Sequence, residues 1–336
     1  MHTEELSKLK IDVLIPTHQP GRIFSELLRR LDAQSIRPAH VRVINTEEQY
    51  WDIQFEEDYP GLIAEHIRKE EFDHGATRHR MVEASDADLI LFMTQDALPA
   101  DRRLIEHLAE QFLDADTSVV QQISEAEPAD TAGRSVPEKL RIGAAYARQL
   151  PRLDCSTLEK YTRSFNYPKE SRVKTKSDLK TMGIKTFFCS NVCAMYDREV
   201  YLEQGGFPQH TIFNEDMIFA RSLIDAGYGI VYAADARVVH SHNYSGRQQF
   251  HRNFDLAVSQ KQHPEVFADV PSEGEGMRMI RKVTAQLFRS GRPWLVIPLI
   301  WQSGCKYAGY LLGKQYKRMP GKLVRICSQN KSFWNK

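Results

Sequence analysis

The chain has 336 residues, of which 42% are hydrophobic and 26% charged, and its formal net charge is +1. These values are typical of a soluble globular protein with one large domain or two smaller ones. Five cysteines, an odd count in a chain that is too long to need disulfides, argue against a disulfide-stabilised secreted protein and favour a reducing compartment.

The first third of the chain alternates between strand and helix patterns. Its opening, MHTEELSKLK, lacks the apolar segment of a secretory signal, so we expect a cytoplasmic protein. Apolar runs and helical spacing of apolar residues predict strands at 11–16, 41–44, 62–67 and 88–93, with helices at 21–34 and 76–84. This alternation predicts an α/β protein with a mostly parallel, Rossmann-like sheet covered by helices on both faces. Ligands bind at the carboxyl ends of the strands in such sheets, and Asp96 follows one of these ends.

The alternation weakens beyond residue 115. Strands are predicted at 119–123, 187–196 and 229–234, a mobile polar segment at 161–180, and a helix at 214–228. This helix has Asn214 as its expected N-cap, acidic residues in its first turn and Gly227 as its stop. Cys189 and Cys193 have no second pair of cysteines, so no zinc site is expected.

The C-terminal segment has a charge balance of its own. Residues 277–336 hold 13 Lys and Arg and no Asp or Glu, whereas residues 1–276 hold 32 basic and 44 acidic residues. A basic tail on an acidic body predicts a polyanionic partner. The longest apolar run, 294–301, is far shorter than the ~20 residues that a membrane span needs. We therefore expect helices that lie in a membrane interface, helices that pack on the domain, or both. Nucleic acid is not expected, because the tail's aromatic residues lie among Leu, Ile and Val.

Several polar side chains follow predicted strands or begin predicted helices. Glu215 and Asp216 begin one helix, Arg78 begins another, and His240 in VVHSHNY follows a strand. With Asp96, these residues supply ligands for a divalent ion, a candidate general base and a cation for a phosphate. Each also has a structural alternative: the acidic residues suit helix capping, and the arginine suits a surface ion pair.

The order of motifs resembles a known family. The chain contains VLIPTH, VINTEE, HGATRHRMVEAS, LILFMTQDALP, GGF, NEDMIFARSLIDAGYGIVY and ARVVHSHNY in succession. This series resembles glycosyltransferase family 2, which has the GT-A fold, and within it the bacterial rhamnosyltransferases that use dTDP-rhamnose. The resemblance covers residues 10–260 and extends into KYAGYLLGKQY in the tail. It implies a GT-A catalytic domain at 1–265, with a nucleotide-binding half at 10–125 and an acceptor-binding half at 126–265. A membrane-associating basic tail follows at 266–336.

The resemblance assigns roles to residues at the ends of the first two strands. Pro16 and Thr17 would line the nucleotide pocket. Asn45 or Glu47 would contact the base and ribose, and the sequence leaves the choice between them open. Arg78 would approach the diphosphate.

The motif TQDA stands where the family has its Asp-x-Asp motif. Asp96 matches one of the two carboxylates, whereas Gln95 occupies a position where an acid is more usual. Gln95 would therefore lie in the nucleotide site, and Asp96 with His240 would hold a divalent metal, Mg²⁺ or Mn²⁺, on the diphosphate. Such an ion would neutralise the charge that develops on the leaving group.

Asp216 matches the family's general base, which takes a proton from the acceptor hydroxyl. Glu215 would raise the pKa of Asp216 by like-charge repulsion or would only orient it. Asn166, Asn191 and His242 would line the donor-sugar or acceptor pocket.

Together these features predict an inverting transfer of L-rhamnose from dTDP-β-L-rhamnose to a saccharide acceptor. The acceptor would be linked to polyprenyl diphosphate, in the synthesis of an O-antigen, capsule or rhamnan. The enzyme would work as a peripheral protein on the cytoplasmic face of the membrane. A homodimer is compatible with this prediction. One alternative is a family 2 enzyme that uses a UDP-sugar, and another is a non-catalytic protein that binds membrane surfaces.

Overall fold

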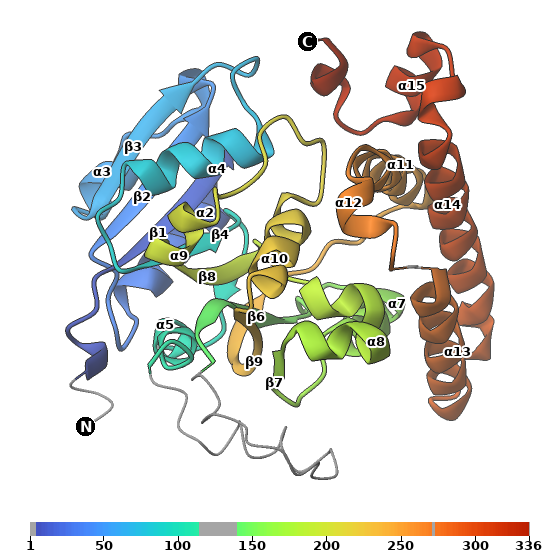
Figure 1. Ribbon diagram of the computed structural model, residues 1–336, viewed down its shortest axis with the longest axis horizontal. Helices are drawn as coiled ribbons and strands as arrows, with labels where there is room; N and C mark the ends of the chain where they lie inside the picture. The colour runs from blue at the N-terminus through green and yellow to red at the C-terminus, as the bar shows by residue number, and fades with distance from the viewer. Residues whose placement is uncertain (1–4, 114–139, 271–272, 336) are drawn as a thin grey trace, which may run out of the picture.

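The computed structural model describes residues 5–113, 140–270 and 273–335. In this part of the chain nine strands form one sheet in the order β3-β2-β1-β4-β8-β6-β9-β5, with β7 beside β9 (Figure 1). The strands run over Ile11–His18 (β1), His40–Thr46 (β2), Leu62–Ile67 (β3), Leu89–Met93 (β4), Leu98–Pro99 (β5), Ile142–Leu150 (β6), Arg172–Lys174 (β7), Cys193–Asp197 (β8) and Gly229–Val239 (β9). Strands β3, β2, β1 and β4 are mutually parallel, and β6 is parallel to β9, whereas β8, β5 and β7 pair antiparallel to their neighbours.

Helices cover both faces of this sheet. Those of the body are Arg22–Asp32 (α2), Gln54–Asp58 (α3), His74–Glu83 (α4), Leu104–Ala109 (α5), Thr157–Asn166 (α7), Leu179–Met182 (α8), Arg198–Glu203 (α9), Glu215–Asp225 (α10), Gly246–Gln262 (α11) and Pro264–Phe267 (α12). Successive side chains of a strand point to opposite faces. Val13 and Ile15 of β1 accordingly pack with α2, α3 and α5, whereas Leu14 packs with α4, α9 and α10. Both faces of the sheet are buried under helices, which explains the continuous apolar runs of the central strands.

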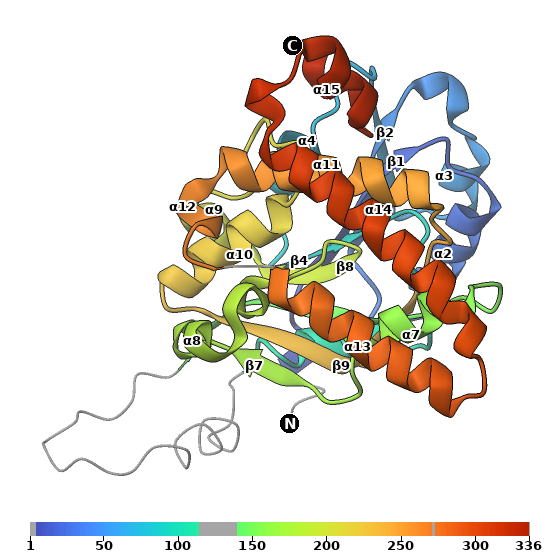
Figure 2. The ribbon, with the colours of Figure 1, turned by 90° about the vertical axis from the view of Figure 1, so that its right-hand side faces the viewer.

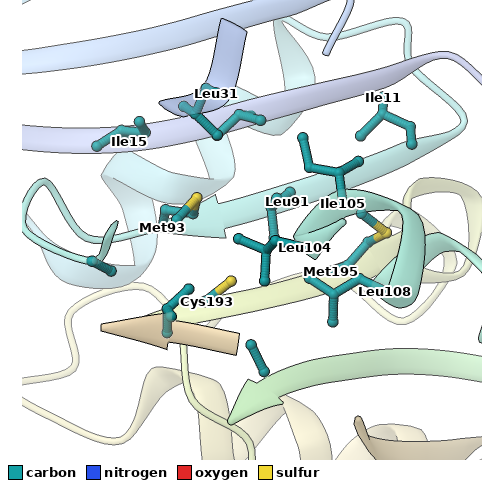
Figure 3. Close-up of a cluster of buried hydrophobic side chains, with 14 of the residues drawn as sticks. Ile11, Ile15, Leu31, Leu91, Met93, Leu104, Ile105, Leu108, Cys193 and Met195 are labelled. Atoms are coloured by element: carbon teal, nitrogen blue, oxygen red, sulfur yellow. The ribbon is translucent and has the colours of Figure 1, made fainter. Parts of the chain in front are cut away.

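Figure 3 shows part of the first of these two cores, in which Leu91 of β4 lies beside Leu104 of α5. The α/β fold with a mostly parallel sheet is therefore confirmed, as are the predicted elements up to β4. The strand predicted at 119–123 lies outside the described residues.

The segment 161–180 was predicted to be mobile, and this prediction is wrong. It contains the second half of α7, strand β7 and the first residues of α8. Ser156 caps α7, and Lys174 is fully buried, with its ammonium group donating to the carbonyl oxygens of Lys185 and Phe188. The polar composition of the segment gives no sign of these buried partners, because they lie 11 and 14 residues along the chain from Lys174.

Two further predictions need correction. The strand predicted at 187–196 begins only at Cys193, because Phe187 ends a 3-10 helix and residues 188–192 form a loop and a turn. Asn214 does precede α10, but its side chain does not cap the helix. Its backbone is left-handed, with a φ of 64°, and its amide nitrogen instead donates to the carbonyl oxygen of Leu256, 3.3 Å away.

The tail forms three helices, Glu273–Arg289 (α13), Val296–Lys314 (α14) and Gly321–Cys327 (α15). Helix α14 crosses α11 on the outside of the body (Figure 2). Gly309 and Gly313 allow this close approach, because a Cβ atom at either position would lie 2.2–2.3 Å from a backbone oxygen of α11. The tail thus packs on the domain, which was one of the two arrangements expected from the sequence.

The tail exposes many large apolar side chains. Its exposed large side chains are Met277, Phe288, Trp294, Ile297, Ile300, Trp301, Tyr307, Leu311, Leu312, Leu323 and Ile326. We call this set the outer tail face. Among the described residues no helix has both the length and the apolarity to cross a bilayer.

Candidate active site

Strand pairing brings Asp96 to the two histidines of VVHSHNY. The short strand β5 pairs antiparallel with the end of β9, with Leu98 opposite Val239. Asp96 lies two residues before this pair and His240 follows it directly. The carboxylate oxygens of Asp96 lie 3.6 Å from His240 Nε2 and 3.3 Å from His242 Nε2, and the two Nε2 atoms lie 3.0 Å apart.

Gln149 at the end of β6 fixes the tautomer of His240. Its Oε1 must face Arg163, because a guanidinium group only donates hydrogen bonds. The same oxygen lies 3.1 Å from His240 Nδ1, so Nδ1 carries the proton and donates it. Burial lowers the pKa of His240 to about 3, and it also lowers the pKa of His242. The Nε2 lone pair of His240 is therefore free to bind a metal at neutral pH.

The donor set of Asp96, His240 and His242 fits a divalent metal ion. One ligand atom from each residue lies within 4.8 Å of the others, which is close enough for all three to reach one ion. A carboxylate oxygen suits Mg²⁺ and Mn²⁺ alike, whereas two imidazoles favour Mn²⁺. The sequence interpretation had placed His242 at the sugar pocket. The structure groups it with Asp96 and His240 as a third ligand candidate.

Gln95 does not join this group. Its Oε1 accepts from the backbone N–H of His18 at 2.8 Å, and its Nε2 donates to the carbonyl oxygen of the same residue at 3.0 Å. The side chain thus ties the end of β1 to the loop after β4. At the position where the family has an acid, Gln95 closes the edge of the predicted nucleotide site.

The residues predicted to meet the nucleotide gather at the ends of β1 and β2. Pro16 and Thr17 of β1 pair with Ile44 and Asn45 of β2. Asn45 is fully buried, and its amide is bonded to Thr17 Oγ1 at 3.0 Å and to the carbonyl oxygen of Glu47 at 3.3 Å. Glu47 keeps a partly exposed carboxylate on a left-handed residue with a φ of 66°. Of the two candidates for base contact, only Glu47 offers a solvent-accessible side chain.

Asp216 and Glu215 begin α10 and differ in their surroundings. The carboxylate of Asp216 accepts from the backbone N–H groups of Met217 at 2.8 Å and Asn191 at 3.3 Å. Burial, reinforced by the charge of Glu215, raises the pKa of Asp216 to about 7. A carboxyl group with such a pKa suits general-base work near neutral pH.

Arg78 reaches this pair and not open solvent. Its guanidinium lies 3.4 Å from a carboxylate oxygen of Glu215, and both side chains are buried. It also donates to the carbonyl oxygen of His74 at 2.9 Å. The positive charge of Arg78 opposes the effect of burial and keeps the pKa of Glu215 low. Glu215 is thus ionised beside Asp216, which is the arrangement that raises the pKa of Asp216.

Hydrogen bonds and the short backbone step from Ser190 to Asn191 link the carboxylate at α10 to the metal group. Gln149 Nε2 donates to the hydroxyl oxygens of Tyr167 at 2.6 Å and Ser190 at 3.1 Å. Asn191, the next residue, is buried and donates its backbone N–H to Asp216. Asn166, at the end of α7, is exposed and takes no part in this path. The sequence interpretation missed Gln149, since a glutamine at a strand end carries no distinctive pattern.

The sheet, the Asp/His group at the strand ends and the carboxylate at the start of α10 are the features that the order of the motifs predicted for a glycosyltransferase with the GT-A fold. A comparison with family models agrees. The model described as glycosyltransferase like family 2 matches residues 9–263. The chain therefore belongs to glycosyltransferase family 2, as the order of its motifs predicted.

Two curated relatives match almost the whole chain. The O-antigen chain rhamnosyltransferase RfbN of Salmonella typhimurium is 35% identical over 329 residues, which is 97% of this chain and 96% of that protein. The O-antigen chain rhamnosyltransferase WbaN of Salmonella anatum is 33% identical over 326 residues, covering 96% and 95%. Among solved structures, the mannosyltransferase PcManGT of Pyrobaculum calidifontis, in complex with GDP-Man and Mn²⁺, has a TM-score of 0.49 at 15% identity. That match covers 97% of this chain and 85% of the other.

Proposed function

We propose that the protein transfers L-rhamnose from dTDP-β-L-rhamnose to a growing O-antigen saccharide, with inversion at the anomeric carbon. The observation that supports the transferred sugar and the product is the similarity, over nearly the full length, to two O-antigen chain rhamnosyltransferases. The dTDP carrier is proposed from the order of the sequence motifs. The geometry supports the chemistry, because Gln149 and the Ser190–Asn191 segment connect the base candidate with the metal-ligand group.

Asp216 would act on the acceptor. Its carboxylate, held by two backbone N–H groups, would take the proton from the acceptor hydroxyl as that oxygen attacks the anomeric carbon. Burial, with the charge of Glu215, keeps the pKa of Asp216 high enough for it to hold this proton near neutral pH. Arg78 neutralises Glu215 and fixes its position.

The donor would lie at the ends of β1, β2 and β4. Thr17, Asn45 and Glu47 would line the nucleotide pocket, with Glu47 contacting the base or ribose. Asp96, His240 and His242 would hold Mn²⁺ or Mg²⁺, which when bound supplies positive charge to the leaving diphosphate. Asn191 and Asn166 would contribute to the sugar pockets on the acceptor side.

We also propose that the enzyme works at a membrane surface on the cytoplasmic side, on a lipid-linked acceptor. The outer tail face offers Trp, Ile and Leu side chains to the lipid interface. The segment 277–336 contains basic residues but no Asp or Glu, and its basic residues would add attraction of roughly 1 kcal/mol each near anionic lipid. In this view residues 1–265 are the catalytic unit and 266–336 the attachment unit.

Donor turnover by the purified chain tests the proposed function. The assay offers dTDP-, UDP- and GDP-sugars with Mn²⁺ or Mg²⁺ and compares the wild type with Asp216→Asn and Asp96→Ala. We expect turnover of dTDP-rhamnose alone, lost in both variants. Turnover of a UDP-sugar in place of dTDP-rhamnose would reject the donor, and full activity of Asp216→Asn would reject the base.

A further inference from the structure

An apolar cavity of about 690 Å³ lies between the body and the tail. We call it the α10–α14 cavity, since its wall includes Asn214 and Met217 at the start of α10 and residues of α11, α13 and α14. Met217 directly follows Asp216, so one end of the cavity lies at the start of the helix that carries the proposed base. Its volume is within the range of ligand-binding sites, about 300–1,000 Å³.

The other end of the cavity opens on the outer tail face. Met277, Ile300 and Tyr307 line the cavity and are at the same time 53–59% exposed. Figure 2 views the side of the molecule on which α13 and α14 lie over the body. The cavity therefore connects the proposed membrane-facing surface with the start of α10. Methionine and isoleucine side chains in its wall suit a flexible hydrocarbon.

Two cations without carboxylate partners stand beside this cavity. Lys306 of α14 lines it, and Arg252 precedes Asn253, which also lines it. Arg252 stacks on the rings of Phe213 at 4.7 Å and Tyr244 at 5.7 Å. In the described part of the chain neither cation forms an ion pair of 4.0 Å or less.

The two cations also act on each other and on the metal group. Burial lowers the pKa of Lys306, nearby Glu159 opposes this shift, and the charge of Arg252 adds to it. Arg252 also lies on the side of the metal group, because the ring of Tyr244, on which it stacks, is 5.1 Å from the ring of His242. Two like charges that are partly buried, neither with a carboxylate within 4.0 Å in the described part of the chain, favour an anionic ligand between the cavity and the site.

We propose that the α10–α14 cavity takes the hydrocarbon chain of a lipid-diphosphate-linked acceptor, with Lys306 and Arg252 on its diphosphate. This inference rests on the proposed function, because it places the acceptor saccharide at Asp216. The hydrocarbon chain would enter from the outer tail face and run toward α10. The diphosphate would then lie at the two cations, and the saccharide beyond it would reach the base.

Glycine positions allow the cavity to be filled without disturbing the body. Gly276 on α13 and Gly304 on α14 both line the cavity, and a Cβ atom at either meets nothing within 4 Å. Gly274 has the same open surroundings on the same helix as Gly276 but does not line the cavity. Gly276→Trp and Gly304→Trp are therefore filling variants, and Gly274→Trp is their matched control for an added surface tryptophan.

The test is calorimetric binding of farnesyl diphosphate to the full-length protein without nucleotide sugar. We expect it to bind more tightly than inorganic diphosphate, and each filling variant to weaken it at least about tenfold, since the buried chain carries most of the affinity. The control should bind like the wild type. Arg252→Met should weaken farnesyl diphosphate and inorganic diphosphate alike.

Equal affinity for farnesyl diphosphate and inorganic diphosphate would overturn the proposal, as would filling variants that bind like the control. Circular dichroism of each variant excludes loss of fold as the cause. Because no donor is present, this result is independent of rhamnose transfer. A chain that binds farnesyl diphosphate through the cavity but turns over no dTDP-rhamnose would contradict the proposed function and leave the cavity assignment in place.

Discussion

Replacing Asp216 with asparagine should stabilise the protein while it abolishes transfer. In the wild type, burial and the charge of Glu215 raise the pKa of this carboxyl group from 3.8 to about 7. The folded protein therefore holds a proton that the unfolded chain releases, so stability falls as pH rises through this window. The full difference corresponds to about 4 kcal/mol, of which about 2 kcal/mol develops between about pH 5.5 and pH 8.

The asparagine removes this ionisation and keeps most of the shape. It can still accept from Met217 N–H but turns its amide nitrogen toward Asn191 N–H, which costs about 1 kcal/mol. The variant should therefore exceed the wild type in unfolding free energy by about 1 kcal/mol at about pH 5.5 and about 3 kcal/mol at about pH 8. Its transfer rate should fall about 10²–10⁴-fold.

Urea denaturation of both proteins at the two pH values measures the stability difference. The wild-type pH profile of kcat/KM supplies a second test, since it should rise with pH and level off above about 7, where Asp216 is ionised. A stability difference that does not grow with pH would refute the elevated pKa. Unchanged activity in the variant would refute the catalytic role.

Three other substitutions test the remaining parts of the site and the tail. Gln149→Leu removes the acceptor for His240 Nδ1–H, so Mn²⁺ affinity measured by electron paramagnetic resonance should fall about 10–100-fold; an unchanged affinity would reject the orienting role. Arg78→Met leaves Glu215 buried without its ion pair, so the unfolding free energy in urea should drop by about 3–5 kcal/mol, and a loss below about 1 kcal/mol would contradict the buried pair. Trp294→Ser should lower co-sedimentation with anionic vesicles several-fold while donor hydrolysis stays intact; equal binding would show that the outer tail face is not the membrane contact.

The local sequence pattern was sufficient to predict the strand and the helix that position the site residues. The apolar strand β4 stops before Asp96, and the helix α10 begins with two acidic residues, both as the sequence indicated. These features depend on hydrophobic periodicity and on residues near in the chain, which a sequence displays directly. The family assignment rested on the order of such local motifs.

Contacts between residues that are far apart in the sequence were not predictable in the same way. The grouping of His242 with Asp96 depends on the pairing of β5 with β9, and the role of Gln149 depends on the register of β6. The ion pair of Arg78 with Glu215 joins α4 and α10 and leaves no periodic trace in sequence. For the same reason the order in 161–180 was missed.

The most direct test of the central claim is the anomeric configuration of the product. Purified protein with Mn²⁺, dTDP-β-L-rhamnose and a lipid-diphosphate-linked saccharide would be analysed by nuclear magnetic resonance of the new linkage. An inverting rhamnosyltransferase with Asp216 as base predicts an α-L-rhamnosyl product that Asp216→Asn does not form. A β-linked product, or no rhamnose transfer while another nucleotide sugar is used, would contradict the account.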